Sequence, residues 1–381
     1  MKITELQTME ERADLLKKTV APFTERAAQY DKKGTFPFEN FNALKSIGYP
    51  ALTLPKKYGG GEISLSEMLY LQAIIGKADG STALSIGWHM GIMKHLGENN
   101  IWDKDKFASV AKDVVATGSL LNNAASEPAT GSPTRGGKPE TYAKKTEQGW
   151  VINGRKTFTT LAPILDYFVV SASIDGTEKI GNFLIKHDIK GVSIDETWDS
   201  IAMRGTGSHD LVLENVQVEK DDLVEELTGG KRKATGWLLH IPACYLGIAR
   251  AAQDYANQFA RTYSPNSISG TISDLPNVKQ KMGEMELAIL ESKHFLFSVA
   301  RKWDGADESM RQTMGPELGA VKLSVVNKAI HVVDLAMRIV GARSLSENNP
   351  LQRYYRDVRA GLHNPPMDDM TIMNLAQTKN N

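Results

Sequence analysis

The sequence has 381 residues and a formal net charge of zero, with 45 Lys and Arg against 45 Asp and Glu. A chain of this length favours two or three domains and buries enough surface to fold without disulfides or a structural metal. The balanced charge argues against nucleic-acid binding, which needs an excess of basic residues. The single cysteine, Cys244, excludes a disulfide framework and a cysteine metal cluster.

Targeting signals are not evident in the sequence. Residues 1–14 are polar and acidic, unlike a secretory signal. The sequence also lacks an uninterrupted apolar run of about 18 residues, the length that a membrane-spanning helix needs. We therefore expect a soluble, cytoplasmic protein that does not enter a membrane.

Residues 1–115 carry a helical pattern. Apolar residues recur at three- and four-residue spacing over 65–75 and over 86–93. Ser64 and Ser66 are candidate caps of the first of these helices, and Glu67 follows Ser64 at the spacing of a capping box.

The pattern changes near Gly118. From there to about Val218 the chain consists of short alternating runs, rich in Val, Ile, Thr and aromatic residues and separated by turn residues. Asn153-Gly154 is a strong turn signal. This block predicts an antiparallel β-barrel or sandwich of about 100 residues.

Helical spacing returns in the last block. Long helices are expected over 235–263, 278–303 and 316–340, and such lengths suit an antiparallel helical bundle. The predicted domains are an N-terminal helical domain over 1–117, a middle β domain over 118–222 and a C-terminal helical bundle over 223–381.

Several common catalytic motifs are missing. No G-x-G-x-x-G fingerprint follows a predicted strand, and no Walker A lysine, H-E-x-x-H or G-x-S-x-G occurs. His89 and His95 share a predicted helix but lie six residues apart, which is poor geometry for binding one metal. The sequence therefore predicts no metal site.

Four segments, in order along the chain, carry a resemblance to a known family. Residues 126–132, S-E-P-A-T-G-S, are similar to the T-E-P-x-x-G-S-D loop of acyl-CoA dehydrogenases. Residues 153–160, N-G-R-K-T-F-T-T, resemble that family's N-G-x-K-x-(W/F)-I-T strand. Residues 203–218 resemble its M-R-x-T-x-S segment and the strand after it, and 340–343 with 353–359 resemble its F-G-G and R-D-x-(R/K) stretch. The resemblance covers nearly the whole chain and implies the same α–β–α layout.

The resemblance implies a noncovalent FAD between the β domain and the C-terminal bundle, in a homodimer or homotetramer. Phe158 would pack on one face of the flat, largely apolar flavin ring. The hydroxyls of Ser126 and Thr160 would hydrogen-bond the polar edge of the ring. Further expected cofactor contacts are Ser132 of the first motif, at a phosphate, and Asn123 and Ala125 just before that motif, where for Asn123 a backbone contact is expected.

In this family the partner subunit completes the adenine end of the FAD. Arg261 is the nearest candidate for the family's arginine, although the R-x-x-F-G spacing is absent and a surface arginine is the alternative interpretation. Gly341 matches a turn where the backbone approaches the diphosphate closely, and Arg343 would donate to it.

The sequence departs from the family at the catalytic base. A desaturating acyl-CoA dehydrogenase removes the α-proton with a glutamate, placed either in the final loop or near the start of the first C-terminal helix. The corresponding residues here are Pro365 and Trp237, neither of which abstracts a proton.

A displaced base would come from the titratable groups nearby. His363 and Asp368 lie in the final loop, and His240 follows Trp237 on the same helical face. For Asp368 the alternative interpretation is a cap of a terminal helix over 370–377, where its charge would meet the helix dipole.

Three functions remain open. The resemblance favours an FAD-dependent oxidoreductase that acts on the CH–CH group of an acyl-CoA in fatty acid metabolism, with electron-transferring flavoprotein as the acceptor. The second is a flavin monooxygenase of the same superfamily, because residues 356–365, R-D-V-R-A-G-L-H-N-P, resemble that branch's R-D-x-R…H-(D/N)-P loop, one residue shorter. His363, with His89 as a second histidine, would then assist oxygen chemistry or take a proton from the substrate. The third is a flavin- or acyl-CoA-binding scaffold without chemistry.

Overall fold

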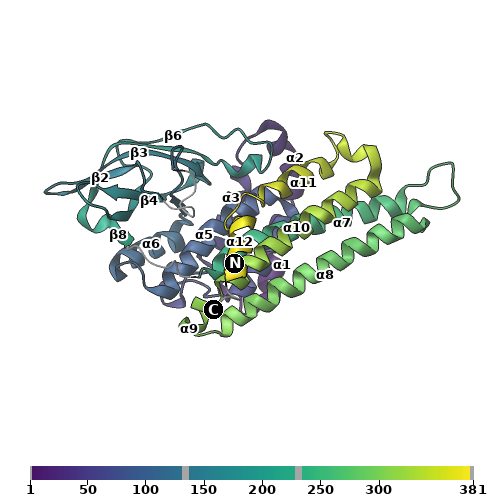
Figure 1. Cartoon of the computed structure of the whole chain (residues 1–381), viewed down its shortest axis with the longest axis horizontal. Coiled ribbons are helices and arrows are strands. Elements are labelled where there is room, and N and C mark those ends of the chain that lie inside the picture. Colours follow the sequence, from purple (N-terminus) through teal and green to yellow (C-terminus); the bar gives the residue numbers. More distant parts are fainter. Residues whose placement is uncertain (1, 131–136, 228–233, 378–381) are drawn as a thin grey trace.

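The computed structural model describes residues 2–130, 137–227 and 234–377. A helical block, a β block and a second helical block follow one another in the predicted order, which confirms the expected fold class (Figure 1). The first block contains α1 (Met9–Val20), α2 (Phe23–Lys33), α3 (Phe38–Ser46), α4 (Leu65–Ala78), α5 (Gly80–Asn99) and α6 (Lys104–Thr117). The last block contains α7 (His240–Thr262), α8 (Pro276–Gly305), α9 (Glu308–Thr313), α10 (Gly315–Val340), α11 (Pro350–Ala360) and α12 (Asp368–Gln377).

The β block forms one eight-stranded sheet, with the order β6-β7-β3-β2-β4-β5-β8 and with β1 paired to β4. Its strands are β1 (Leu121–Ala124), β2 (Tyr142–Lys145), β3 (Gly149–Thr159), β4 (Tyr167–Ile174), β5 (Ile180–Lys186), β6 (Val192–Asp195), β7 (His209–Glu219) and β8 (Leu223–Leu227). The sheet is not purely antiparallel, because both β1 and β2 pair with β4 in parallel. It also extends past the expected domain boundary at residue 222, because β8 pairs with β5.

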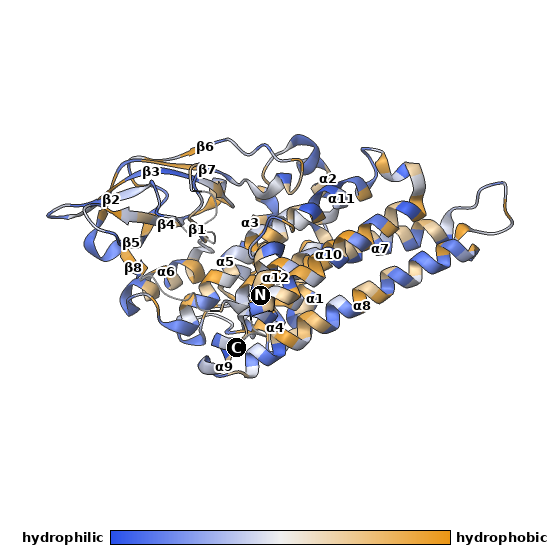
Figure 2. Cartoon of the chain, in the orientation of Figure 1, coloured by the Kyte–Doolittle hydropathy of each residue, from blue (hydrophilic) through white to orange (hydrophobic). Residues whose placement is uncertain are grey.

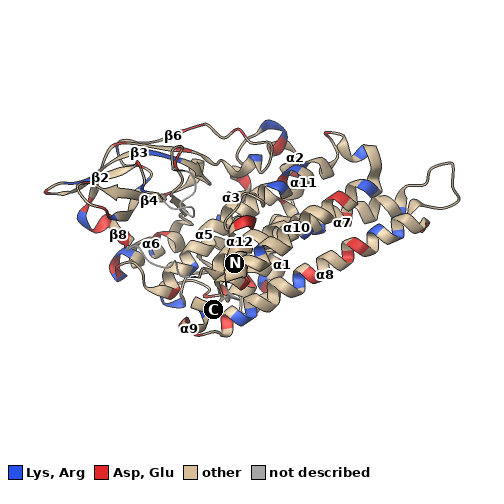
Figure 3. Ribbon diagram, viewed as in Figure 1, with Lys and Arg blue, Asp and Glu red and all other residues tan. Residues whose placement is uncertain are grey.

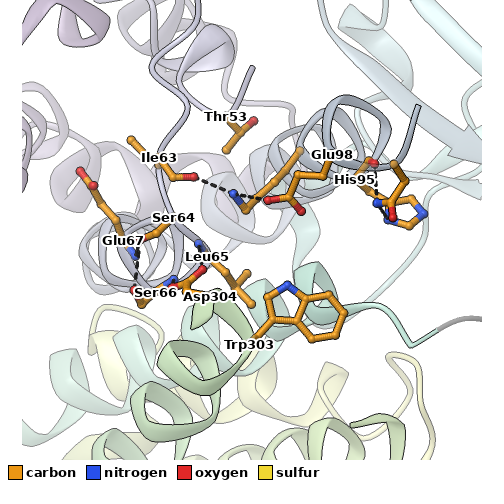
Figure 4. Close-up of polar contacts among 12 residues, drawn as sticks. Thr53, Ile63, Ser64, Leu65, Ser66, Glu67, His95, Glu98, Trp303 and Asp304 are labelled. Atoms are coloured by element: carbon orange, nitrogen blue, oxygen red, sulfur yellow. Dashed lines mark hydrogen bonds and ion pairs between the residues drawn. The ribbon is translucent and has the colours of Figure 1, made fainter. Parts of the chain in front are cut away.

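The start of α4 ties the two helical blocks together (Figure 4). The Ser64 hydroxyl accepts the Glu67 N–H at 3.1 Å, which confirms the capping role expected of Ser64. Asp304, at the end of α8, accepts the N–H groups of Leu65 and Ser66 at 2.7 and 2.9 Å. A carboxylate at a helix N-terminus is stabilising, since it satisfies free N–H groups and meets the positive end of the dipole.

Helix α7 lies at the centre of the packed helices. A Cβ added at Gly247 would lie 2.5 Å from the Ala73 carbonyl oxygen, and one at Gly76 would lie 2.5 Å from the Cys244 carbonyl oxygen. Helices α4 and α7 therefore pack backbone against backbone. The inward faces of the bundle are apolar, as the orange segments of α7 and α10 in Figure 2 show.

The neighbouring residues Arg356 and Asp357 on α11 connect three parts of the molecule. The Arg356 guanidinium forms two bonds to the Asp31 carboxylate on α2, at 2.9 and 2.5 Å. The Asp357 carboxylate is buried and accepts the Met203 N–H from the β6–β7 loop at 2.7 Å. The pair therefore connects α11 to the N-terminal block and to the β block.

Charged residues of both signs occur along the outer helices, as the blue and red segments of α8 in Figure 3 show. Among the described residues, no helix combines the length and the apolar character that a membrane span requires.

Candidate active site

Phe158, the second-last residue of β3, has a conformation that exposes its ring. Its φ is +55°, in the left-handed region, and 67% of its surface is accessible. The edge of Trp198 lies near it, with ring centroids 6.1 Å apart. An exposed phenyl ring on strained backbone is the type of feature that persists at ligand sites, because a flat apolar ligand can cover the ring.

A chain of hydroxyl groups begins beside Phe158. The Thr160 hydroxyl lies 2.9 Å from that of Ser208, which lies 2.8 Å from that of Thr206. Thr206 donates to the Met203 carbonyl at 3.0 Å, and the Thr160 carbonyl accepts from the Asn122 side chain at 2.9 Å. The Thr160 hydroxyl is therefore held in place. Ser208 and Thr206 were not expected as site residues, although the M-R-x-T-x-S motif contained them.

The loop before β2 is tied to β3. The Ser126 carbonyl accepts the Thr157 N–H at 2.9 Å, and the side chains of Ser126 and Ala125 are half-buried beside this contact. Asn123 is exposed, and its backbone N–H donates to Asn122. Ser132 lies outside the described residues.

An ion pair beneath this loop is fully buried. Lys156 Nζ lies 2.5 Å from Glu127 Oε1, and the side chains are 0% and 1% exposed. Burial opposes the charge on Glu127, but the bonds from Lys156 and from the backbone of Glu140 and Thr141 outweigh it and lower the pKa of that carboxyl. Glu127 and Lys156 belong to two of the segments that resemble the family, and they pair with each other. They shape the loop rather than contact a ligand.

His240 lies among aromatic side chains at the start of α7. It stacks on Trp237 with ring centroids 6.0 Å apart and planes 6° apart, and it meets Trp88 edge-on at 4.9 Å. The imidazole is fully buried, and neither ring nitrogen has a hydrogen-bond partner. Burial lowers its pKa to about 3, so the ring is neutral and a weak proton acceptor at neutral pH.

The loop after α11 presents His363 to solvent. The neighbouring Asn364 accepts the Tyr245 hydroxyl from α7 at 2.6 Å. The Asp368 carboxylate is not free to act as a base, because it accepts hydrogen bonds from Lys322 at 3.3 Å and from Asn327 at 2.9 Å. It is also the first residue of α12, where its charge meets the helix dipole.

His89 is engaged on both sides of its ring. Its Nδ1 accepts the Leu121 N–H at 3.0 Å, and its Nε2 lies 3.1 Å from the Pro50 carbonyl, to which it donates. Burial lowers its pKa to about 4. His89 therefore links the N-terminal block to β1 and has no ring nitrogen left for a substrate.

The residues expected at the adenine end lie at the C-terminal ends of α7 and α10, and these ends lie at the other end of the bundle from the sheet (Figure 1). Gly341 closes α10 with a φ of +72°, and a Cβ there would meet nothing within 4 Å. The Arg343 guanidinium lies over the Tyr263 ring at 4.5 Å, and Arg261 is exposed. Within one chain these residues do not approach Phe158.

Profiles of three acyl-CoA dehydrogenase domains match the chain. The N-terminal domain matches residues 4–99, the middle domain 122–216 and the C-terminal domain 239–364. This chain belongs to the acyl-CoA dehydrogenase family. Family members are flavin enzymes, and the exposed Phe158 ring with the hydroxyls of Thr160 and Ser208 fits the face and polar edge of a flavin.

The names of this chain's relatives describe different reactions. It is 56% identical to "Putative acyl-CoA dehydrogenase YdbM" of Bacillus subtilis (strain 168), over 93% of this chain and 92% of that protein. It is 28% identical to the 3-(aryl)acrylate reductase of Clostridium sporogenes, over 92% and 93% of the two chains. It is also 28% identical to the L-evernosamine nitrososynthase of a Micromonospora strain, over 91% and 84%.

Solved structures share the fold at lower identity. FMN-bound TdsC from Paenibacillus sp. A11-2 matches with a TM-score of 0.85 and 22% identity, over 96% of each chain.

Proposed function

We propose that this acyl-CoA dehydrogenase family member is a flavin-dependent monooxygenase that acts on a small molecule. One observation carries the proposal: neither position of the family's base holds a carboxylate, and of the nearby substitutes His240 is buried and Asp368 is engaged, which leaves only the exposed His363. Trp237 stacks on the buried His240, and Asp368 is paired with Lys322. Desaturation requires an ionised base at the α-carbon, whereas oxygenation does not.

The bound flavin would supply two electrons to O₂, so that one oxygen atom enters the substrate and the other leaves as water. Phe158 would cover one face of the ring, and the hydroxyls of Thr160 and Ser208 would orient its polar edge. His363, on an exposed loop, would exchange the protons that water formation consumes, since a histidine can hold or give up a proton near neutral pH. The relative named L-evernosamine nitrososynthase supports oxygen chemistry on a small substrate.

Oxidation of an acyl-CoA is the second candidate. The name of the 56% identical relative favours it, and the 3-(aryl)acrylate reductase acts, by its name, on an acrylate. This function would include FAD as the cofactor, electron-transferring flavoprotein as the acceptor, a cytoplasmic location and a role in fatty acid metabolism.

The oligomeric state belongs to the same proposal. Arg261, Gly341 and Arg343 lie away from Phe158 within one chain, so only a second copy would bring them to the adenine end of an FAD. A homodimer or homotetramer with FAD follows if these residues bind it. Chromatography of the released cofactor distinguishes FAD from the FMN bound by TdsC.

The two reactions differ in the compound that reduces the flavin. In dehydrogenation the acyl-CoA reduces it, whereas in oxygenation the flavin must be reduced before it meets O₂. The test adds short acyl-CoAs to flavin-loaded enzyme without oxygen, and separately supplies reduced flavin, ¹⁸O₂ and a panel of small amines and sulfides. We expect no bleaching by acyl-CoAs and incorporation of ¹⁸O into at least one panel compound. Anaerobic bleaching by an acyl-CoA would instead establish the second candidate.

A further inference from the structure

A cleft of about 1270 Å³ lies between the two helical blocks. Helices α1, α2 and α4 of the first block and α7 and α11 of the last block provide most of its lining. Ile74 on α4 and Ala251 on α7 belong to the apolar part of that lining. Phe158 and Thr160 do not line the cleft, so it is separate from the candidate flavin site.

Arg353 of α11 is a buried cation in the wall of this cleft. It is 5% exposed and lies on the helix face that also carries Arg356. No carboxylate of the described residues forms an ion pair with Arg353, whereas Arg356 pairs with Asp31 at 2.5 Å. The ring and hydroxyl of Tyr354, the neighbours of the guanidinium, carry no charge. Asp357, one turn along the helix, is a weak counter-ion, because burial raises its pKa to about 7. A buried arginine is rare without a partner, since an uncompensated buried charge costs free energy.

The acidic side chains of the cleft do not supply that partner. Asp254 on α7 pairs with Lys77 on α4 at 2.5 Å. Glu25 and Glu347 also line the cleft, but both are exposed to water. The positive charge of Arg353 is therefore left for a ligand.

The N-terminus of α11 is a second feature that favours an anion in the same place. Asn349 and Pro350, at the start of the helix, line the cleft. The Asn349 side chain accepts the Leu351 N–H at 3.0 Å and donates to the Tyr255 hydroxyl on α7 at 2.9 Å, so this end of the helix is fixed. Helix α11 has 11 residues, and the positive end of its dipole lies at the cleft.

We propose that the cleft binds an organic anion, with a phosphate or carboxylate at Arg353 and an apolar body against α4 and α7. The Arg353 guanidinium can donate two parallel hydrogen bonds to either head group. The apolar body covers Ile74 and Ala251, and the burial of this surface adds to the affinity. The ligand is a different molecule from the flavin, and its binding does not depend on the proposed oxygenation.

The test measures binding to the flavin-loaded full-length protein by calorimetry. The probes are phenyl phosphate, phenylacetate and 2-phenylethanol, which share an aromatic body and differ in the head group. We expect at least one of the two anions to bind about tenfold or more tightly than the neutral alcohol, because a charge-assisted hydrogen bond is lost in the alcohol. The anion that binds more tightly identifies the head group. Equal affinities for all three probes, or no binding of either anion, would refute the proposal.

Variants of the cleft provide the second measurement. Arg353→Gln should weaken binding of the preferred anion about tenfold or more. Arg301→Gln, at an exposed arginine of α8 outside the cleft, is the matched control and should leave the affinity unchanged. Ala28→Trp, on the α2 side of the cleft, fills the space with Arg353 in place. It should also abolish binding, which keeps the test decisive if Arg353→Gln does not fold.

One further variant separates this site from the flavin site. Phe158→Ala should bind the anion like the unmodified protein, because Phe158 does not line the cleft. Loss of binding in Phe158→Ala, or unchanged binding in a folded Arg353→Gln protein, would contradict the proposal. Failure of the proposed oxygenation would show instead as missing ¹⁸O, with anion binding intact.

Discussion

At the scale of single residues, Phe158 and Thr160 combine an exposed aromatic surface with a fixed hydroxyl. The strand β3 ends at this point, and the left-handed Phe158 turns its ring outward. The hydroxyl chain through Ser208 and Thr206 holds Thr160 beside it. A flat ligand with one polar edge is the complement of this arrangement.

Replacing Phe158 tests whether a flat ligand packs on its ring. Phe158→Ala should weaken flavin binding about fivefold, because aromatic stacking contributes about 1 kcal/mol beyond the area it buries. Fluorescence titration of cofactor-free protein with FAD and FMN measures the effect. Phe38→Ala, at another exposed phenylalanine, is the control and should bind flavin like the unmodified protein. Equal affinities in all three proteins would remove Phe158 from the site.

His363 is the exposed histidine of the loop after α11. His363→Ala should lower turnover about a hundredfold if this side chain transfers a proton, which is the lower range for general acid–base catalysis. His294→Ala, at an exposed histidine on α8, serves as the comparison. Unaltered rates for His363→Ala would exclude it as a catalytic residue.

At the scale of elements, α12 is held to α10 by the contact between Asp368 and Lys322. The Lys322 side chain is 2% exposed, and burial lowers its pKa even though Asp368 opposes the shift. Asn327, on the same helix, donates to the other oxygen of the carboxylate. Asp368, a candidate catalytic base by sequence, is therefore the partner of the buried Lys322.

Because Asp368 pairs with a buried lysine, replacing Asp368 should lower the stability of the fold and not the turnover. Asp368→Asn should reduce the free energy of unfolding by about 1 kcal/mol, since it leaves a buried ammonium unpaired while the partly exposed carboxylate moderates the loss. Urea denaturation measures the change. Glu178→Gln, in the exposed pair with Lys138, should change it by far less. A stable Asp368→Asn protein with abolished turnover would return Asp368 to the catalytic candidates.

At the scale of the whole molecule, Asp357 and Arg356 connect the three blocks. Burial raises the pKa of Asp357 from 3.8 to about 7, although the Met203 N–H and the charge of Arg353 act against the shift. The folded protein therefore retains a proton on Asp357 over a pH range in which the unfolded chain has lost it.

The raised pKa of Asp357 makes the stability of the fold depend on pH. Between about pH 4 and pH 7 the folded state binds more protons at Asp357, so its contribution to stability falls as the pH rises and is fully lost above pH 7. Asp357→Asn keeps an acceptor for the Met203 N–H without the charge. Relative to the unmodified protein, this variant should gain of the order of 3 kcal/mol between pH 4 and pH 8. Urea denaturation across this range checks the difference, and parallel curves would contradict the shifted pKa.

Local patterns alone predicted the order of the three blocks and the Ser64 cap, whereas Phe158 and Thr160 came from the family resemblance. Periodicity, capping and turn signals act over a few residues, so they can be read from the sequence. The family resemblance also located the β3 and loop segments of the candidate site.

Tertiary structure decided what those residues do. Strand β8 joins the sheet because it meets β5, His89 is engaged because Pro50 and Leu121 lie on either side, and Asp368 is engaged because Lys322 is buried beneath it. His240 is neutral because two indoles cover it. Pairing, burial and pKa depend on contacts between segments far apart in the chain, and no local pattern encodes which segments meet.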